Sequence, residues 1–252
     1  MFPDFDWVGV LAGKPAAWLV TGVLTTAYVT LVAGLIATVL AMLIFAARVA
    51  RTPLARWPAT ALIEVFRDTP LLVQLLFWYF GAFVLLPRPA RVWLSDDHTW
   101  ATLPGGVGAM TPEFLAGAWG LALFSAVFIA EELRTGLLAV PRGQGEAAAS
   151  QGFGPWAILW DVLLPQALRN AWQPVVGQYL NLMKLSSLAT AIGLGEITYQ
   201  VRQIESYNSH ALEAFAVGTA LYLLFGVVMA QAFFHLGPTP LDALGDNRER
   251  KH

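Results

Sequence analysis

The sequence contains no cysteine and few charged residues. With no cysteine among 252 residues, a disulfide framework, a thiolate nucleophile and a thiolate metal site are all excluded. Charged residues make up 13% of the chain and hydrophobic residues 57%, and the mean hydropathy is +0.58. That composition excludes an ordinary soluble globular domain, so we expect an integral membrane protein.

Motifs for catalysis and for nucleotide binding are also missing. No GxxxxGK[ST] phosphate loop occurs, and the glycine run at 105–108 has no lysine after it. No serine stands on a recognisable nucleophile turn. The four histidines lack close histidine or carboxylate partners at the spacing of metal ligands; they are His98, His210, His235 and His252. We expect neither an enzyme nor a metal site, and no nucleic-acid partner.

Long apolar stretches dominate the chain. A helix needs about 20 apolar residues to cross the hydrocarbon core of a bilayer. Five stretches meet this requirement, at about 18–47, 59–86, 113–140, 172–194 and 211–236. Residues 87–112 are rich in proline and glycine and carry charges of both signs, which is typical of a loop. The sequence therefore predicts an all-α integral membrane protein with five transmembrane helices in one domain, 1–252.

The basic residues are unevenly divided between the two ends of these spans. If the spans alternate in direction, ten fall on one side: Arg48, Arg51, Arg56, Arg67, Arg134, Arg142, Arg169, Arg248, Arg250 and Lys251. Four fall on the other side: Lys14, Arg88, Arg91 and Arg202. Because cytoplasmic loops are enriched in lysine and arginine, we expect the N-terminus outside and the C-terminus in the cytoplasm.

The segment 143–165 is a polar interruption between the third and fourth spans. A helix-forming run from Glu146 to Gln151 meets a stop at Gly152, and a new helix can begin at Pro155. Pro165 is expected to end this second short helix before the fourth span. The pattern predicts a small cytoplasmic knob that a partner protein could grip. The alternative is an ordinary amphipathic loop on the membrane surface.

The spacing within this segment resembles the EAA loop of permease subunits of binding-protein-dependent ABC importers. Glu146-Ala147-Ala148 is followed after three residues by Gly152, and after nine more by Val162-x-Leu164-Pro165. The family usually has isoleucine where this chain has Val162.

The stretches "EVFRDTPLLVQLLFWYF", "IAEELRTGLLAVPRGQGEAA" and "NLMKLSSLATAIGLGEI" are similar to the second, third and fourth spans of polar amino-acid permeases. The stretches "LVQLLFWYF", "NLMKLSS" and "TYQVRQIES" look most like the glutamate/aspartate branch.

The resemblance implies a type I ABC importer permease fold with several partners. In that family the loop forms a coupling helix seated on a dimer of cytoplasmic ATPase subunits, which bind the ATP and Mg, so no cofactor is expected in this chain. An amino-acid-binding protein would deliver substrate to 87–112 and 195–210, and a second permease subunit, the same or related, would complete the path. The location implied is the bacterial inner membrane, surrounded by lipid. The coupling residues would be Gly145, Glu146, Ala147, Ala148, Gly152, Leu164 and Pro165.

Polar side chains within the spans are the candidate substrate pathway, since ionisable groups at membrane depth are costly and commonly functional. Gln178, Asn181 and Lys184 recur at three-residue spacing and share a helical face, and Ser187 follows. Gln74 could also face the pathway. Lys184 has an alternative role, namely pairing with a carboxylate of a neighbouring helix.

Glu131 and Arg134 stand one turn apart near the cytoplasmic end of the third span. A local ion pair explains them, and a role in gating or in contact between subunits is the alternative.

Two other classes of protein fit the composition. An ion-coupled secondary amino-acid carrier would be expected to have inverted repeats and broken helices, whereas the five spans have no self-similarity. A structural membrane anchor would not need the polar stripe of the fourth span. The function that the resemblance implies is that of the membrane subunit of an ATP-driven importer for a polar amino acid.

Overall fold

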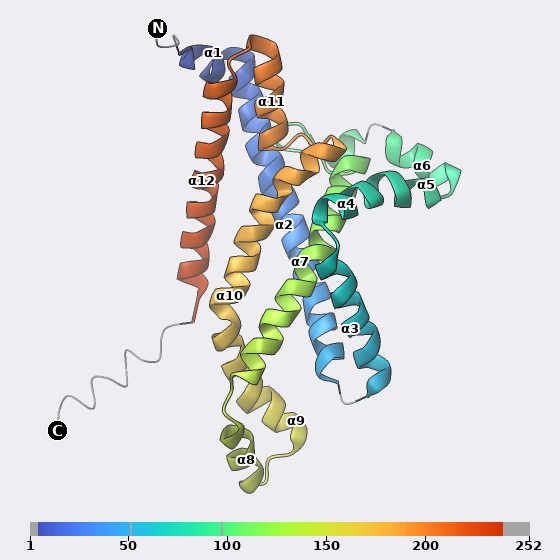
Figure 1. Cartoon of the computed structure of the whole chain (residues 1–252), viewed down its shortest axis with the longest axis vertical. Helices are drawn as coiled ribbons and strands as arrows, with labels where there is room; N and C mark the ends of the chain where they lie inside the picture. Colours follow the sequence, from blue (N-terminus) through green and yellow to red (C-terminus); the bar gives the residue numbers. More distant parts are fainter. Residues whose placement is uncertain (1–4, 51, 97, 239–252) are drawn as a thin grey trace, which may run out of the picture.

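The computed structural model describes residues 5–50, 52–96 and 98–238, and most of them are helical. Helices α2, α7, α10 and α12 run along the long axis of the molecule (Figure 1). The helices are α1 (Trp7–Leu11), α2 (Gly13–Val49), α3 (Pro53–Asp68), α4 (Leu71–Leu76), α5 (Phe83–Leu85), α6 (Arg88–Ser95), α7 (Pro112–Leu138), α8 (Arg142–Ser150), α9 (Pro155–Ala157), α10 (Leu164–Leu185), α11 (Ile197–Asn208) and α12 (Ala211–Leu236). The other elements of the described residues are two π-helical turns (Phe77–Ala82, Ile158–Leu163), two 3-10 segments (Thr99–Ala101, Ser186–Ile192) and two short strands, β1 (Thr102–Leu103) and β2 (Val107–Gly108).

Three helices of the described residues are long and apolar enough to cross a membrane: α2, α7 and α12. They overlap the first, third and fifth expected spans. Helix α2 has 37 residues, and at 1.5 Å per residue its length of about 56 Å exceeds the bilayer core of about 30 Å. Helix α2 is therefore long enough to extend beyond the hydrocarbon region.

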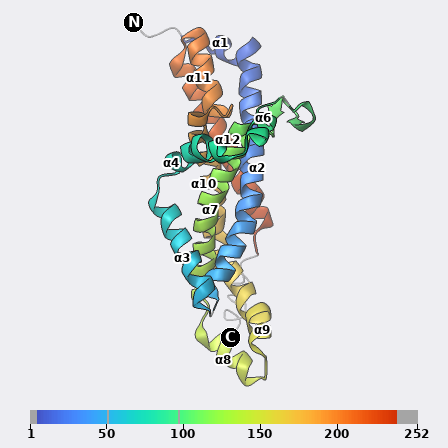
Figure 2. The ribbon, with the colours of Figure 1, turned by 90° about the vertical axis from the view of Figure 1, so that its right-hand side faces the viewer.

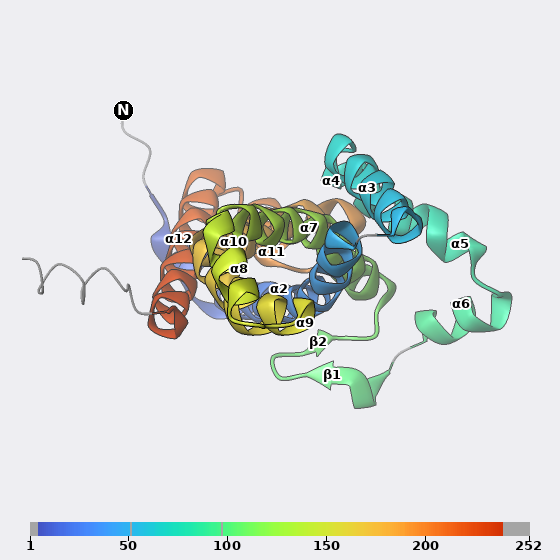
Figure 3. The ribbon, with the colours of Figure 1, turned by 90° about the horizontal axis from the view of Figure 1, so that it is seen from below.

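The second expected span, 59–86, is not a straight helix. Helix α3 and the helical segment Leu71–Leu85 meet at 105° and would count as a fourth span only if they form one broken span. Thr69, at the break, has an extended backbone, and Pro70 follows it. A residue before proline is pushed out of the α region, so the helix stops there. Figure 3 shows α3 to α6 and the β-hairpin on one side of the bundle, with α12 on the opposite side.

The fourth expected span, 172–194, also differs from the observed helix. Helix α10 begins at Leu164, and Pro155 to Leu185 is one continuous helical path because a π-helical turn joins α9 to α10. The expectation that Pro165 ends a short helix is wrong. Pro165 is the second residue of α10 and directly follows the π-helical turn, so its missing N–H falls where the hydrogen-bonding pattern of the helix changes. At the other end, α10 changes to a 3-10 segment from Ser186 to Ile192.

Residues 87–112 contain more structure than the loop that their composition predicts. They include the amphipathic helix α6 and an antiparallel hairpin in which Leu103 pairs with Val107. The glycine run forms the hairpin turn. Gly105 and Gly106 have φ of 85° and 77°, a left-handed conformation that favours glycine.

Small residues allow α7 to pack closely against α2 and α10. Buried alanines recur along the facing stripes of α2 and α7: Ala33, Ala37, Ala41, Ala118, Ala122, Ala126 and Ala130. On α10, Ala167 and Ala171 are buried opposite Gly136 of α7. Interfaces between membrane helices are enriched in small residues because backbones can then approach and gain dispersion contacts.

We expect Gly136→Ala to destabilise the bundle. A Cβ atom at this position would lie 2.5 Å from the carbonyl oxygen of Ala167 and 2.7 Å from the Cβ of Ala171. Such overpacking costs about 1–3 kcal/mol. The measurement is the thermal unfolding midpoint in detergent. Gly177→Ala in α10 is the control, because nothing lies within 4 Å of its added Cβ. An equal midpoint for both variants would contradict the close packing.

Candidate functional site: a coupling knob and a polar helix face

The segment 143–165 forms a knob at one end of the molecule. Helices α8 and α9 project beyond the ends of α7 and α10 (Figure 1, Figure 2). Glu146 and Ala147 are exposed on α8, whereas Ala148 is buried against the rest of the knob and Gly145 is half-buried. The EAA sequence therefore has one face toward solvent and one face packed.

Gly152 makes the turn that the sequence predicts. Its φ is +86°, a left-handed value that glycine adopts without strain. The N–H groups of Gly152 and Phe153 donate to the carbonyls of Ala149 and Ala148, which closes the end of α8. Leu164 is half-buried and Pro165 exposed where α10 begins. The exposed aromatic side chains of the knob are Phe153, Trp156 and Trp160.

The polar stripe lies on an open face of α10. Asn181 and Lys184 are exposed, and Gln178 and Ser187 are half-buried. Gln178 Nε2 donates to Glu132 Oε1 of α7 at 3.2 Å. The Ser187 hydroxyl donates to the Lys184 carbonyl at 2.8 Å. Within the described ranges Lys184 forms no ion pair, so the alternative of pairing with a neighbouring carboxylate is not observed.

Gln74 lies apart from this stripe, at the break between α3 and α4. Its Nε2 donates to the carbonyl oxygens of Phe66 and Thr69, both at 3.0 Å. These carbonyls belong to the last turn of α3 and its C-cap and have no partner inside the helix. The Gln74 amide thus stabilises the break, and the structure does not bring it together with Gln178.

Glu131 and Arg134 form the expected pair, with 3.5 Å between Arg134 Nη1 and Glu131 Oε2. The structure adds a second cation, because Arg48 Nε of α2 lies 3.5 Å from Glu131 Oε1. One carboxylate therefore balances basic side chains of α2 and α7 near the end that carries the knob. Arg48 could not be identified from the sequence because it lies 83 positions before Glu131.

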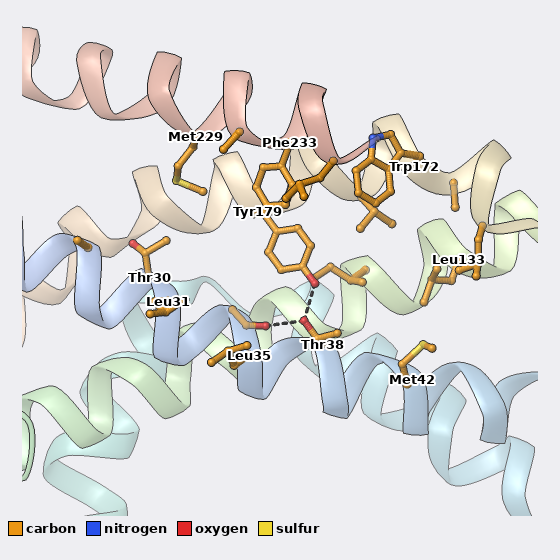
Figure 4. A pocket seen from close by; sticks show the side chains of 18 of the residues that line it. Thr30, Leu31, Leu35, Thr38, Met42, Leu133, Trp172, Tyr179, Met229 and Phe233 are labelled. Atoms are coloured by element: carbon orange, nitrogen blue, oxygen red, sulfur yellow. Dashed lines mark hydrogen bonds between the residues drawn. The ribbon is translucent and has the colours of Figure 1, made fainter. Parts of the chain in front are cut away.

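A large apolar pocket lies between α2, α10 and α12 (Figure 4). Its volume is about 690 Å³, and aliphatic and aromatic side chains such as Leu35, Leu133 and Phe233 form most of its wall. Tyr179 and Thr38 share a hydrogen bond of 2.5 Å across it. None of the stripe residues lines this pocket. A charged amino acid would lose its hydration there without replacement, so the pocket is a poor site for one.

The structure contains a buried carboxylate, Glu196, that the sequence did not reveal as a candidate. It caps α11 by accepting from the N–H groups of Thr198 and Tyr199 at 3.0 and 2.9 Å. The hydroxyls of Thr190 and Tyr222 donate to the same carboxylate. The signal available in the sequence was a glutamate at the start of a helix, but Tyr222 is brought to it only by the packing of α12 against α11.

The prediction that the histidines lack carboxylate partners is wrong for His210. Its Nε2 lies 3.6 Å from Asp6 Oδ2, and its Nδ1 lies 3.4 Å from Glu213 Oε1. These contacts tie the N-terminal segment to the start of α12. His252 lies outside the described residues. The described ranges contain no group of three or more histidine, cysteine, aspartate or glutamate residues that could hold a metal ion.

Comparison with known protein families agrees with this architecture. The model of the family "Binding-protein-dependent transport system inner membrane component" matches residues 31–239. The chain belongs to this family. The match contains the knob, the break between α3 and α4, and the polar face of α10, so the permease carries all of these features within its family region.

Two relatives and one solved structure illustrate the similarity. The permease is 33% identical over 166 residues to the glutamate/aspartate import permease protein GltJ of Escherichia coli K12, covering 66% of this chain and 63% of that relative. It is 31% identical to the octopine transport system permease protein OccM of Rhizobium radiobacter, covering 92% and 86%. A crystal structure of an amino acid ABC transporter with histidines superposes with a TM-score of 0.76 at 25% identity, covering 93% and 98%. The fold is that of ABC importer permeases.

We expect Glu196→Ala to lower the stability of the end of the bundle that lies opposite the knob. The substitution leaves the hydroxyls of Thr190 and Tyr222 and two N–H groups of α11 without their acceptor. An orphaned buried donor costs roughly 1–3 kcal/mol. Thermal unfolding in detergent measures the loss. Glu205→Ala on α11 is the control, since its carboxylate forms no hydrogen bond or ion pair with the described residues. Equal midpoints would show that the Glu196 network contributes nothing.

Proposed function

We propose that the permease is the membrane-spanning subunit of an ATP-driven importer that moves a polar amino acid into the cytoplasm. The observation that carries this proposal is the knob 143–165, which has the EAA spacing of the family and exposes Glu146 and Ala147 at one end of the bundle. A dimer of ATPase subunits would bind this surface of the permease, and the same subunits would bind the ATP and Mg. The permease itself would provide the path.

The geometry of the knob suggests how a movement of the ATPase subunits is transmitted to the helices of the substrate path. Helix α8 follows α7 after a short link, and the helical path from Pro155 continues into α10. A displacement of α8 would therefore act on the two helices that carry Glu131 and Gln178. Two permease subunits present two knobs, which the proposed outward-facing state holds close together. If nucleotide-bound ATPases bind this close arrangement more tightly than the separated one, they stabilise the outward-facing state by that difference in binding free energy. This is alternating access driven from the knob.

The proposed orientation places the knob in the cytoplasm of a bacterial cell with the permease in the inner membrane. Helix α8, which begins at Arg142, lies toward one end together with the end of α2, which carries Arg48, and the start of α3, which carries Arg56. Helix α11 and the start of α2 lie toward the other end (Figure 1). The basic bias at the knob end supports a cytoplasmic location. The basic residues Arg51, Arg248, Arg250 and Lys251 lie outside the described residues.

The remaining partners follow from the same proposal. An extracytoplasmic amino-acid-binding protein would dock at 87–112 and 195–210, at the opposite end from the knob. A second permease subunit, the same chain or a sister chain, would complete the path along the open face of α10. Relatives named for glutamate/aspartate, arginine and glutamine support an amino acid as the substrate. The glutamate/aspartate relative supports an acidic amino acid as the first candidate.

Transport in proteoliposomes tests the proposal. We expect uptake of a labelled amino acid to require the partner ATPases, ATP and the binding protein, because the path opens outward only when the ATPases close. The measurement compares uptake with ATP, with a non-hydrolysable analogue and without the ATPases. Uptake that persists without the ATPases and follows an ion gradient would instead establish an ion-coupled carrier.

We expect Glu146→Lys and Gly152→Leu to uncouple ATP hydrolysis from uptake. The first reverses a charge on the exposed face of α8, and the second strains a residue with φ of +86°. The measurement is the ratio of amino acid transported to ATP hydrolysed, which should fall to a small fraction of the wild-type value.

The control for the glycine variant is Gly13→Leu. Gly13 also has a positive φ, of 63°, and open space around it, but it is the first residue of α2, far from the knob along the chain. Its ratio should match that of the wild type. Normal ratios for Glu146→Lys and Gly152→Leu, at normal expression, would mean that the knob does not couple.

A further inference from the structure

Two neighbouring carboxylates on α7 have different surroundings. Glu131 lies between two cations, Arg48 and Arg134, each at 3.5 Å. Glu132 forms no ion pair with any described residue, although it is half-buried in a helix apolar enough to cross a membrane. Within the described part of the chain its carboxylate accepts one hydrogen bond, from Gln178 Nε2 at 3.2 Å. One Glu132 oxygen therefore remains available.

An unpaired cation lies farther along the facing helix. Lys184 is exposed and forms no ion pair among the described residues. It follows Gln178 by six positions, which corresponds to about 9 Å along α10 at 1.5 Å per residue. Asn181 lies midway on the same face. Along the bundle, the Glu132 carboxylate is thus followed by the Asn181 amide and then by the Lys184 ammonium group.

Isolated charges of opposite sign at membrane depth are costly, and such groups usually pair with one another or line a pathway. Two other carboxylates of the bundle do have partners: Glu131 has its arginines, and Glu196 has four donors. Glu132 and Lys184 form no ion pair with each other in the described residues. A zwitterion placed between them supplies the missing partner to each.

We propose that Glu132 binds the α-ammonium group of the transported amino acid, while Lys184 binds its carboxylate. The inference deepens the proposed function and rests on it. Gln178 positions the Glu132 carboxylate through its amide, and Asn181 offers a donor and an acceptor between the two charges. The site therefore takes α-amino acids with a free ammonium group and rejects the corresponding acids that lack it.

Direct binding to the purified complex of permease and ATPase, without the binding protein, tests this assignment. The probes are labelled L-glutamate, L-glutamine and L-arginine, each also competed with the unlabelled acid that lacks the α-amino group. For the amino acid that the wild type binds, we expect Glu132→Gln to weaken affinity by about ten-fold or more, as for the loss of one charge-assisted hydrogen bond. Glu132→Asp, which keeps the charge, should recover part of the affinity. The deaminated acid should not compete.

The control is Glu113→Gln on the same helix. Glu113 accepts one hydrogen bond, from the Tyr79 hydroxyl at 2.8 Å, and glutamine can still accept it. Glu113→Gln should bind like the wild type. Unchanged affinity in Glu132→Gln, or equal competition by the deaminated acid, would overturn the assignment of Glu132 while leaving the proposed function intact. If the wild type bound none of the probes and transported none with ATP, the proposed function would fail, and this inference with it.

Discussion

The close packing of α7 is the constraint on which the other features depend. Its alanines meet the alanine stripe of α2, and Gly136 lets the backbone of α10 approach without a side chain between them. The Asn170 side chain donates to the Gly136 carbonyl at 3.2 Å and fixes the same crossing. Because α7 leads to α8 after a short link, this packing places the knob and the proposed pathway residues on connected, closely packed helices.

Hydrogen bonding separates the structural polar groups of the bundle from those that remain available to a ligand. Glu196 and Gln74 have donors or acceptors supplied by nearby backbone and hydroxyl groups, and they hold a helix end and a helix break. Glu131 is balanced by arginines. Glu132, Asn181 and Lys184 lack comparable partners in the described residues. The role of a polar group in a membrane helix is therefore better inferred from its hydrogen-bond and ion-pair partners than from its presence alone.

Helix α10 illustrates why hydropathy alone misplaces a span. Its polar residues keep it below the apolarity of α2, α7 and α12, so it is absent from the helices that qualify by length and composition. In the bundle those residues face the open side, while Ala167, Ala171 and Leu182 are buried against neighbouring helices. A helix that lines a polar path can be less apolar than one surrounded by lipid, because only part of its surface meets the hydrocarbon.

The sequence by itself determined the membrane class, the approximate extents of α2, α7 and α12, and the turn at Gly152, since these follow from local hydropathy and backbone preference. It also placed Gln178, Asn181 and Lys184 on one face, because helical periodicity is a local property. Only the tertiary structure decided that Gln74 stabilises the break, that Arg48 joins Glu131, and that Glu132 meets Gln178. Those contacts join residues on different helices or across a 105° bend, and their geometry depends on packing that no local pattern encodes.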